Sequence, residues 1–403
     1  MAETYFEKMP VVPPAAGGPT EAEETVPGIS SSTRIPALDG LRGIAILLVL
    51  IQHTFLGFHF VHHPALNWLV RMSRLSWSGV DLFFVLSGFL IGGILLDARS
   101  SPNYFKTFYL RRAYRILPLY FLVLTLAWLT FKAGQLGWLR GDWAGLFSGA
   151  IPWWTFFTFT QNISMVLAGP LVGRAGLSPT WSLAVEEQFY LTLPLVVRFA
   201  SKRRLVQIVA GGIAGAALMR FLVALHSPDR MFATYLLTPC RADALGLGVL
   251  AAVLVRERQA WAYVRARRWG LYAAAGVLLA VLLLIDLSSF ETYSPMFYGT
   301  EYSIFAAFFV SLLLIALSRN DWFVRTVFCN PWLMRLGLIA YGTYLFHRTT
   351  IHLAHLLMKS VPQSAVFFVA SMLLGVGSAI LIAEFSWTWF EKPLVRHGHR
   401  HRY

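Results

Sequence analysis

The stretch LDGLRGIAILLVLIQHTF, residues 38–55, is an apolar run long enough to cross a lipid bilayer, yet it holds two ionisable side chains. Arg42 and His53 are eleven positions apart. At about 100° per residue this separation is three full turns plus roughly 20°, so both side chains lie on one helix face, about 16 Å apart along it. Ionisable side chains are costly in hydrocarbon and therefore face polar cavities. The stretch predicts a membrane helix that carries part of a functional site.

The composition extends this interpretation to the whole chain. Of its 403 residues, 57% are hydrophobic and 13% are charged, whereas a typical soluble domain has about 25% charged residues. We expect an all-α, polytopic transmembrane helical bundle over residues 35–393, with no second folded domain. We also expect a disordered cytoplasmic tail at 1–34 and a basic cytoplasmic tail at 394–403.

The formal net charge of +14 suggests nucleic acid as a partner, but the distribution of the charges argues against it. Lys and Arg gather in short segments between apolar runs, as topology signals do. With the N-terminus in the cytoplasm, 24 of the 34 Lys and Arg residues fall on the inner side and eight on the outer side. We therefore expect both termini in the cytoplasm. Ten runs are long enough to cross, at about 41–60, 80–96, 116–132, 183–200, 205–225, 240–255, 269–287, 302–318, 335–357 and 364–390.

The segment 153–170, WWTFFTFTQNISMVLAGP, is nearly long enough to be an eleventh span. It contains Gln161 and Asn162 and is interrupted by Gly169 and Pro170. A crossing here would place the later basic clusters on the outer side. We therefore expect this segment to be re-entrant or to lie in the membrane interface. Irregular backbone at that depth is tolerated only against protein or a watery cavity.

His53 is the first candidate for chemistry. A neutral imidazole accepts a proton near pH 7, although histidine also serves as hydrogen-bonded packing between membrane helices. Asp81 opens the second span, at the depth of His53 in this topology. It would either orient His53 or sit at a helix N-terminus because a carboxylate is favourable there. We expect His53 and Asp81 to be catalytic.

A polar stripe follows in SPTWSLAVEEQFYLTLPL, residues 178–195. Ser182, Glu186 and Tyr190 recur every four residues, so they lie on one helical face at the outer mouth of the fourth span. Together with Trp181 they predict a hydrogen-bonding wall of a substrate pocket, although carboxylates at a span entrance are also ordinary interfacial residues. Glu186 is expected to be catalytic, either by steadying an imidazolium or by acting as a base.

Arg111, Arg112 and Arg115 lie within about one turn just before the third span, on the predicted cytoplasmic side. Positive-inside anchoring explains one or two of them, whereas three arginines on one turn also form a phosphate clamp. His347, beside Arg348, lies in the middle of the ninth run and is expected to face the same cavity. The histidines of HFVHHP and HGHRHRY are interpreted as solvated, and no metal site is predicted.

These motifs, in this order and on ten spans, resemble the acyltransferase-3 family of bacterial membrane proteins, which O-acylate glycans and related acceptors. The likeness covers nearly the whole chain, from residue 35 to 393, and includes GVDLFFVLSGFLI and WSLAVEEQFY. The matched motifs are the Arg, ten residues, His pattern, the paired arginines, and the Ser, three residues, Glu pattern, at Arg42 and His53, Arg112 and Arg115, and Ser182 and Glu186.

The resemblance implies an enzyme of the bacterial cytoplasmic membrane. It would transfer an acyl group, expected to be acetyl, from acyl-coenzyme A to a hydroxyl of a carbohydrate or glycosylated acceptor, with no bound cofactor. The donor's phosphates would lie on the three arginines and its thioester would extend towards His53. Some family members carry a fused extracytoplasmic esterase-like domain, so here any such partner would be a separate protein or would be unnecessary. The other residues implied to bind substrate are Arg42, Trp181, Ser182, Tyr190 and His347.

A proton-coupled secondary transporter is the alternative from another class, because intramembrane His, Asp and Glu also form proton relays. The sequence has no convincing inverted repeat. A transporter would move its solute without consuming a thioester, whereas the enzyme must release coenzyme A. A structural scaffold would leave the intramembrane ionisable residues unexplained. The acceptor, the acyl chain length, the oligomeric state and whether His53 itself carries the acyl group stay open.

Overall fold

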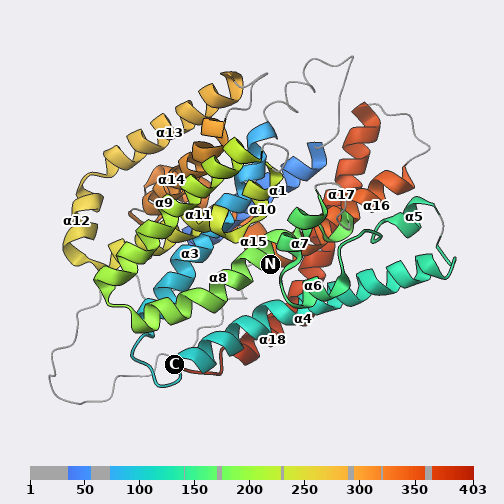
Figure 1. The fold of residues 1–403 in the computed structure, drawn as a ribbon, viewed down its shortest axis with the longest axis horizontal. Helices are drawn as coiled ribbons and strands as arrows, with labels where there is room; N and C mark the ends of the chain where they lie inside the picture. The colour runs from blue at the N-terminus through green and yellow to red at the C-terminus, as the bar shows by residue number, and fades with distance from the viewer. Residues whose placement is uncertain are drawn as a thin grey trace, which may run out of the picture.

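The computed structural model describes residues 35–55, 73–139, 141–169, 175–227, 231–288, 295–318, 321–358 and 365–403. All regular elements within these ranges are helices, and the long ones run side by side in one bundle (Figure 1). The predicted all-α bundle is confirmed. The predicted tail at 1–34 and the histidines of residues 59–64 lie outside the described residues.

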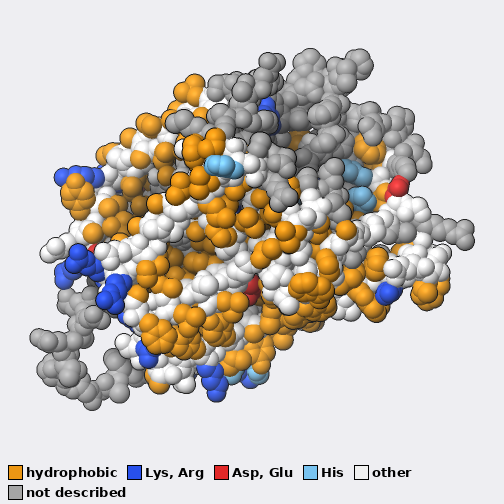
Figure 2. Space-filling model, viewed as in Figure 1, with side chains coloured by type: hydrophobic (Ala, Val, Ile, Leu, Met, Phe, Trp, Pro, Cys, Tyr) orange, Lys and Arg blue, Asp and Glu red, His pale blue; other side chains and the backbone are white. Residues whose placement is uncertain are grey.

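Eight helical segments of the described chain are long and apolar enough to cross a membrane, so the chain is a multi-pass membrane protein. Figure 2 shows a largely hydrophobic face on which Lys and Arg gather mainly towards the lower end. The segments are α1 (Pro36–Phe55), η1 with α3 (Ser73–Ser78 and Gly79–Asp97), α4 (Tyr104–Gln135), α9 (Lys202–His226), η4 with α11 (Thr238–Arg241 and Ala242–Arg256), α13 (Arg268–Ser288), α14 (Pro295–Ser318), and α17 with η6 and α18 (Ala365–Ser386, Trp387–Glu391 and Lys392–Gly398).

The two remaining predicted spans are helical but less apolar than these eight. They are α8 (Thr180–Phe199) and α16 (Ala340–Leu357), the latter preceded by α15 (Pro331–Leu338). Both helices are polar for a specific reason: α8 carries the Ser, Glu and Tyr stripe, and α16 carries several Thr and His residues. Candidate site residues, such as Glu186 on α8 and His347 on α16, are among those that lower their hydropathy.

The segment 153–170 forms two short helices in its described part, α6 (Trp153–Phe157) and α7 (Gln161–Ala168). Five and eight residues at about 1.5 Å per residue are too short to cross a bilayer. The side-chain amides of Gln161 and Asn162 are buried and donate to the backbone carbonyls of Thr180 and Leu236, at 2.8 and 3.1 Å. The amide nitrogens of both side chains are therefore satisfied by protein, whereas Gln161 Oε1 is buried without a hydrogen-bond partner among the described residues.

Shorter helices connect the long ones. They are α5 (Asp142–Gly145), η2 (Ala175–Leu177), α10 (Phe232–Leu236), α12 (Arg258–Ala266) and the π-helical turn η5 (Val324–Phe328). Figure 1 shows α18 running along the N-terminal half of α4, and the two helices are in contact. The last residues of the chain, predicted as a basic tail, thus continue from a helix that packs on the bundle.

Helix α3 packs against α11 with its backbone close to that of its neighbour. A Cβ atom added at Gly88 would lie 2.0 Å from the carbonyl oxygen of Leu245, and one added at Gly248 would lie 2.2 Å from the carbonyl oxygen of Val85. Small residues at helix contacts allow such approach in membranes. This contact holds α3 in place, and α3 carries Ser87 at the candidate site.

We expect Gly88→Ala to destabilise the protein, because the new methyl group meets backbone that has no freedom to rotate away. Overpacking of this kind typically costs about 1–3 kcal/mol. Gly92→Ala on the same helix is the matched control, since its Cβ would lie 3.4 Å from the Cα atom of Val249, an ordinary contact. Thermal unfolding in detergent should show a lower midpoint for Gly88→Ala than for Gly92→Ala. Equal midpoints would contradict the close approach of the two backbones.

Candidate active site

A cavity of about 130 Å³ lies inside the bundle between α1, α3, α4, α8 and α16. Its apolar side is formed mainly by aromatic and aliphatic residues of α3, including Phe83 and Phe84. Three sequence motifs on three helices converge on its polar side. The polar lining residues are Arg42, Ser87, Arg112, Arg115, Ser182, Glu186, Tyr190, Tyr341 and Tyr344.

The predicted stripe on α8 forms one wall of this cavity. Tyr190 donates its hydroxyl hydrogen to Glu186 Oε2 at 3.0 Å, and its oxygen lies 2.7 Å from Ser87 Oγ on α3. Ser182 Oγ lies 2.5 Å from the Tyr344 hydroxyl, which also reaches the carbonyl oxygen of Pro179 at 2.8 Å. The four-residue spacing therefore does bring the three side chains to one hydrogen-bonded surface, with partners from α3 and α16.

Two of the three clustered arginines reach the cavity. Arg112 and Arg115 are three positions apart on α4 and share a face, and Arg42 joins them from α1, where it also contacts Asp39 at 3.2 Å. Among the polar lining residues, these guanidinium groups outnumber the single carboxylate of Glu186. The cavity is therefore suited to an anionic group.

Arg111 points elsewhere, which corrects the expectation of a three-arginine clamp. Its Nε and Nη2 atoms donate to the carbonyl oxygen of His401 at 3.0 and 2.6 Å, and its guanidinium lies 4.9 Å from the ring centre of Tyr403. Helical spacing alone does not separate Arg111 from the other two, because it lies about 40° from Arg115 around the helix. Its hydrogen bonds to the end of the chain hold it away from the cavity.

His399 lies near these arginines. Burial and their positive charges lower the pKa of its imidazole, so His399 adds little positive charge to the arginine cluster near neutral pH.

His53 and His347 meet beyond one end of the cavity, and neither is among its lining residues. Their ring centres are 4.7 Å apart in an edge-to-face arrangement, with His53 on α1 and His347 on α16. Tyr344, which lines the cavity, lies one turn before His347, and the two rings are 5.5 Å apart. The pair is thus connected to the cavity through Tyr344.

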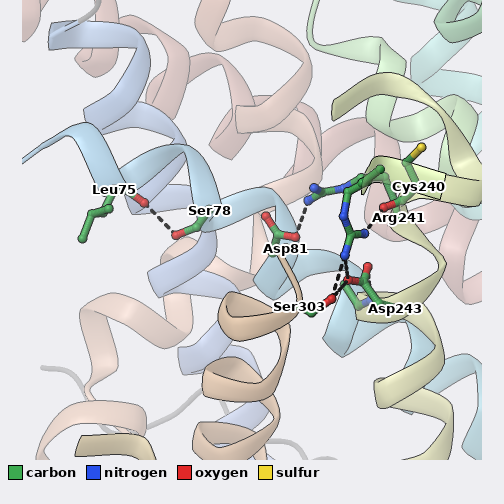
Figure 3. Close-up of polar contacts among 9 residues, drawn as sticks. Leu75, Ser78, Asp81, Cys240, Arg241, Asp243 and Ser303 are labelled. Carbon is green, nitrogen blue, oxygen red and sulfur yellow. Dashed lines mark hydrogen bonds and ion pairs between the residues drawn. The ribbon is translucent and has the colours of Figure 1, made fainter. Parts of the chain in front are cut away.

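Asp81 lies in the first turn of α3, the second of the two positions expected for it. It forms a buried ion pair with Arg241 rather than orienting His53. Figure 3 shows Asp81 and Arg241 beside Asp243 and Ser303. Arg220 on α9 donates to Asp243 at 2.8 Å and to Ser303 at 2.6 Å. The four charged side chains are completely buried, so this ionic cluster links α3, α9, η4, α11 and α14.

Trp181 is also directed away from the cavity. Its ring packs against Tyr235 and Phe84, with ring centres 4.4 and 6.1 Å away. Sequence reasoning missed three cavity-lining hydroxyls, those of Ser87, Tyr341 and Tyr344. The two tyrosines had a detectable signal, because they are three positions apart and Tyr344 is three before His347. Arg220, inside the apolar helix α9, likewise indicated a buried carboxylate partner, which the structure shows to be Asp243.

The fold and the cavity define the chain as an integral-membrane protein with a polar internal site, and comparison with known proteins assigns its family. The family model described as an acyltransferase domain, the acyltransferase-3 family, matches residues 35–384. The chain therefore belongs to this family, as its sequence motifs implied.

Curated relatives extend this assignment. The chain is 28% identical over 376 residues to the peptidoglycan O-acetyltransferase OatA of Listeria monocytogenes, covering 90% of this chain and 56% of that protein. It is 29% identical over 378 residues to the putative peptidoglycan O-acetyltransferase YrhL of Bacillus subtilis, covering 91% and 56%. A putative O-acetyltransferase of Staphylococcus aureus is 25% identical over 384 residues, covering 90% and 58%. The chain thus spans about half the length of these relatives. No solved structure matches it significantly.

Proposed function

We propose that the chain is a membrane-bound O-acyltransferase that moves an acetyl group from acetyl-coenzyme A to a hydroxyl of a carbohydrate acceptor. The observation that carries this proposal is the convergence of Arg42, Arg112 and Arg115 with Ser182 and Glu186 on one cavity, next to His53. Because two relatives are named as peptidoglycan O-acetyltransferases, glycan strands of peptidoglycan are the first acceptor to test.

In this proposal the cationic side of the cavity holds the donor. Arginine binds phosphate oxygens in bidentate geometry, so Arg112 and Arg115 would hold the phosphates of coenzyme A. Following the charge distribution, these arginines and both chain termini would lie on the cytoplasmic side. The acyl thioester would then extend along the apolar wall of α3 towards Tyr344 and the histidine pair.

The residues at the other end would carry out the transfer. The Nδ1 atom of His53 lies 2.9 Å from the carbonyl oxygen of Val49, so Nδ1 carries the hydrogen and Nε2 keeps its lone pair. Nε2 would take the proton of the acceptor hydroxyl while the oxygen of that hydroxyl forms a bond to the acyl carbon. The bond from carbon to sulfur breaks and the thiolate leaves. The hydroxyls of Ser182 and Tyr344 now bond to each other and to the carbonyl oxygen of Pro179. They would turn on substrate binding to donate to the oxygen that becomes negative in the transition state.

The test is the transfer itself, in proteoliposomes that contain the protein, acetyl-coenzyme A labelled in its acetyl group, and glycan strands purified from cell walls. We expect coenzyme A to appear at a rate that depends on the glycan, and the label to appear on the glycan as a base-labile ester in equal amount. Protein-free liposomes are the control. Uptake of solute driven by a proton gradient, with no coenzyme A released, would contradict the proposal and favour a transporter.

A further inference from the structure

The histidine pair at the end of the cavity includes His347, which is not part of the motif formed by Arg42 and His53. Its position suggests a role of its own in the transfer. We infer that His347 receives the proton that His53 takes from the acceptor hydroxyl, so that the two imidazoles act as one base. This inference rests on the proposed acyl transfer and adds a proton-sharing residue to it. His347 acts through His53, and is in that sense a positioning residue.

The hydrogen bonds of the two rings fix which nitrogen is free in each. His53 Nδ1 lies 2.9 Å from the carbonyl oxygen of Val49, and His347 Nδ1 lies 2.7 Å from that of Tyr344. A carbonyl oxygen only accepts, so each Nδ1 carries a hydrogen and each Nε2 keeps a lone pair. Two imidazoles in the same tautomer therefore meet with both basic nitrogens available.

His347 is an unusual residue if it serves only to pack the bundle. It is completely buried, and its Nε2 atom has no hydrogen-bond partner among the described residues. An unsatisfied buried polar atom destabilises the fold, a cost that an apolar side chain of similar size would avoid. The ring that carries this acceptor has its centre 4.7 Å from that of His53. A lone pair kept free next to a base is what proton transfer requires.

Electrostatics limits the pair to one proton. Two imidazolium ions with ring centres 4.7 Å apart would repel each other strongly in a buried site. Arg348, the next residue on α16, also contributes positive charge there. The transfer needs only one proton to move. It leaves the acceptor hydroxyl, is held by the two imidazoles, and finally protonates the coenzyme A thiolate. The pair then returns to its neutral form.

Chemical rescue separates proton sharing from packing. In the proteoliposome assay we expect His347→Ala to lower kcat by about 10²-fold, the lower end of the usual range for acid–base groups. The KM for acetyl-coenzyme A should be unchanged because the arginines are intact. Added imidazole should restore at least a tenth of the wild-type rate. Pyrazole, which has the same ring shape but is scarcely protonated near neutral pH, should restore none.

The matched control is His352→Ala, which changes a half-buried histidine on the same helix. This variant should keep wild-type activity, and added imidazole should not change its rate. His347→Gln retains a hydrogen-bonding side chain that cannot carry a proton, and should lose activity as much as His347→Ala. Full activity in either His347 variant, or equal rescue by pyrazole and imidazole, would overturn the inference. An inactive wild type would instead contradict the proposed function, so the two failures are distinguishable.

Discussion

Replacing His53 with alanine will lower the rate of coenzyme A release by about 10²–10⁴-fold, the range expected when a positioned base is removed. The reason is that His53 Nε2 has a free lone pair, next to His347 and the cavity residue Tyr344. Binding of coenzyme A should persist, because Arg42 lies eleven positions away, about 16 Å along α1. Stopped assays of coenzyme A release and equilibrium binding together measure the two quantities.

His226→Ala is the matched control for this variant. His226 also places its Nδ1 atom against the carbonyl oxygen four residues earlier, that of Leu222, at 3.0 Å. It differs from His53 in being exposed near the end of α9. We expect His226→Ala to release coenzyme A at the wild-type rate. A fully active His53→Ala protein would remove His53 from the chemistry, and loss of coenzyme A binding would show instead that the helix had been disturbed.

Helical periodicity explains why part of the site could be predicted from the sequence. The faces that Arg42, Ser182, Glu186 and Tyr190 occupy depend only on 3.6 residues per turn, so local spacing identified them. The same arithmetic did not exclude Arg111, which lies about 40° from Arg115 around the helix. Its absence from the cavity follows from a contact with a distant segment, because it donates to the carbonyl oxygen of His401.

Contacts between distant segments could not be predicted in this way. Asp81 and Arg241 are 160 positions apart, and nothing in the local sequence of either indicates the other. The same holds for Tyr344, whose link to Ser182 spans 162 positions. Such pairs follow from the packing of α3, α8, α11 and α16, which the close backbone contact at Gly88 and Gly248 helps to determine. Apolar runs located the spans, whereas the packing of the helices determines which distant residues contact each other.

The number of membrane spans also shows where prediction from apolar composition reaches its limit. Sequence reasoning expected ten crossings, and eight described segments meet a simple criterion of length and apolar composition. The two that do not, α8 and α16, bring Glu186 and His347 to the site. These candidate site residues are among the polar residues that lower the hydropathy of the two helices. Marginal hydropathy in a membrane protein is thus itself a pointer to function.

The second large effect is expected on the binding of acetyl-coenzyme A, at the end of the cavity that holds Arg112 and Arg115. We expect Arg112→Gln and Arg115→Gln each to raise the Kd for acetyl-coenzyme A by about 10–100-fold, because a hydrogen bond to a charged group is worth about 1.5–3 kcal/mol and tenfold corresponds to about 1.4 kcal/mol. Both guanidinium groups line the cavity. Lys106→Gln, an exposed cation earlier on α4, is the control and should leave the Kd unchanged. Isothermal titration in detergent measures all three.

Arg111→Gln distinguishes a two-arginine site from the three-arginine clamp that the sequence suggested. If all three arginines held phosphate, its effect on the Kd would equal that of Arg112→Gln. Because Arg111 instead holds the carbonyl oxygen of His401 and stacks against Tyr403, its loss should free the end of the chain and change the Kd far less. Equal effects at the two positions would mean that the donor displaces this end of the chain when it binds. A small effect at Arg111 beside a large one at Arg112 would place the phosphates inside the cavity, on the face that Arg112 shares with Arg115.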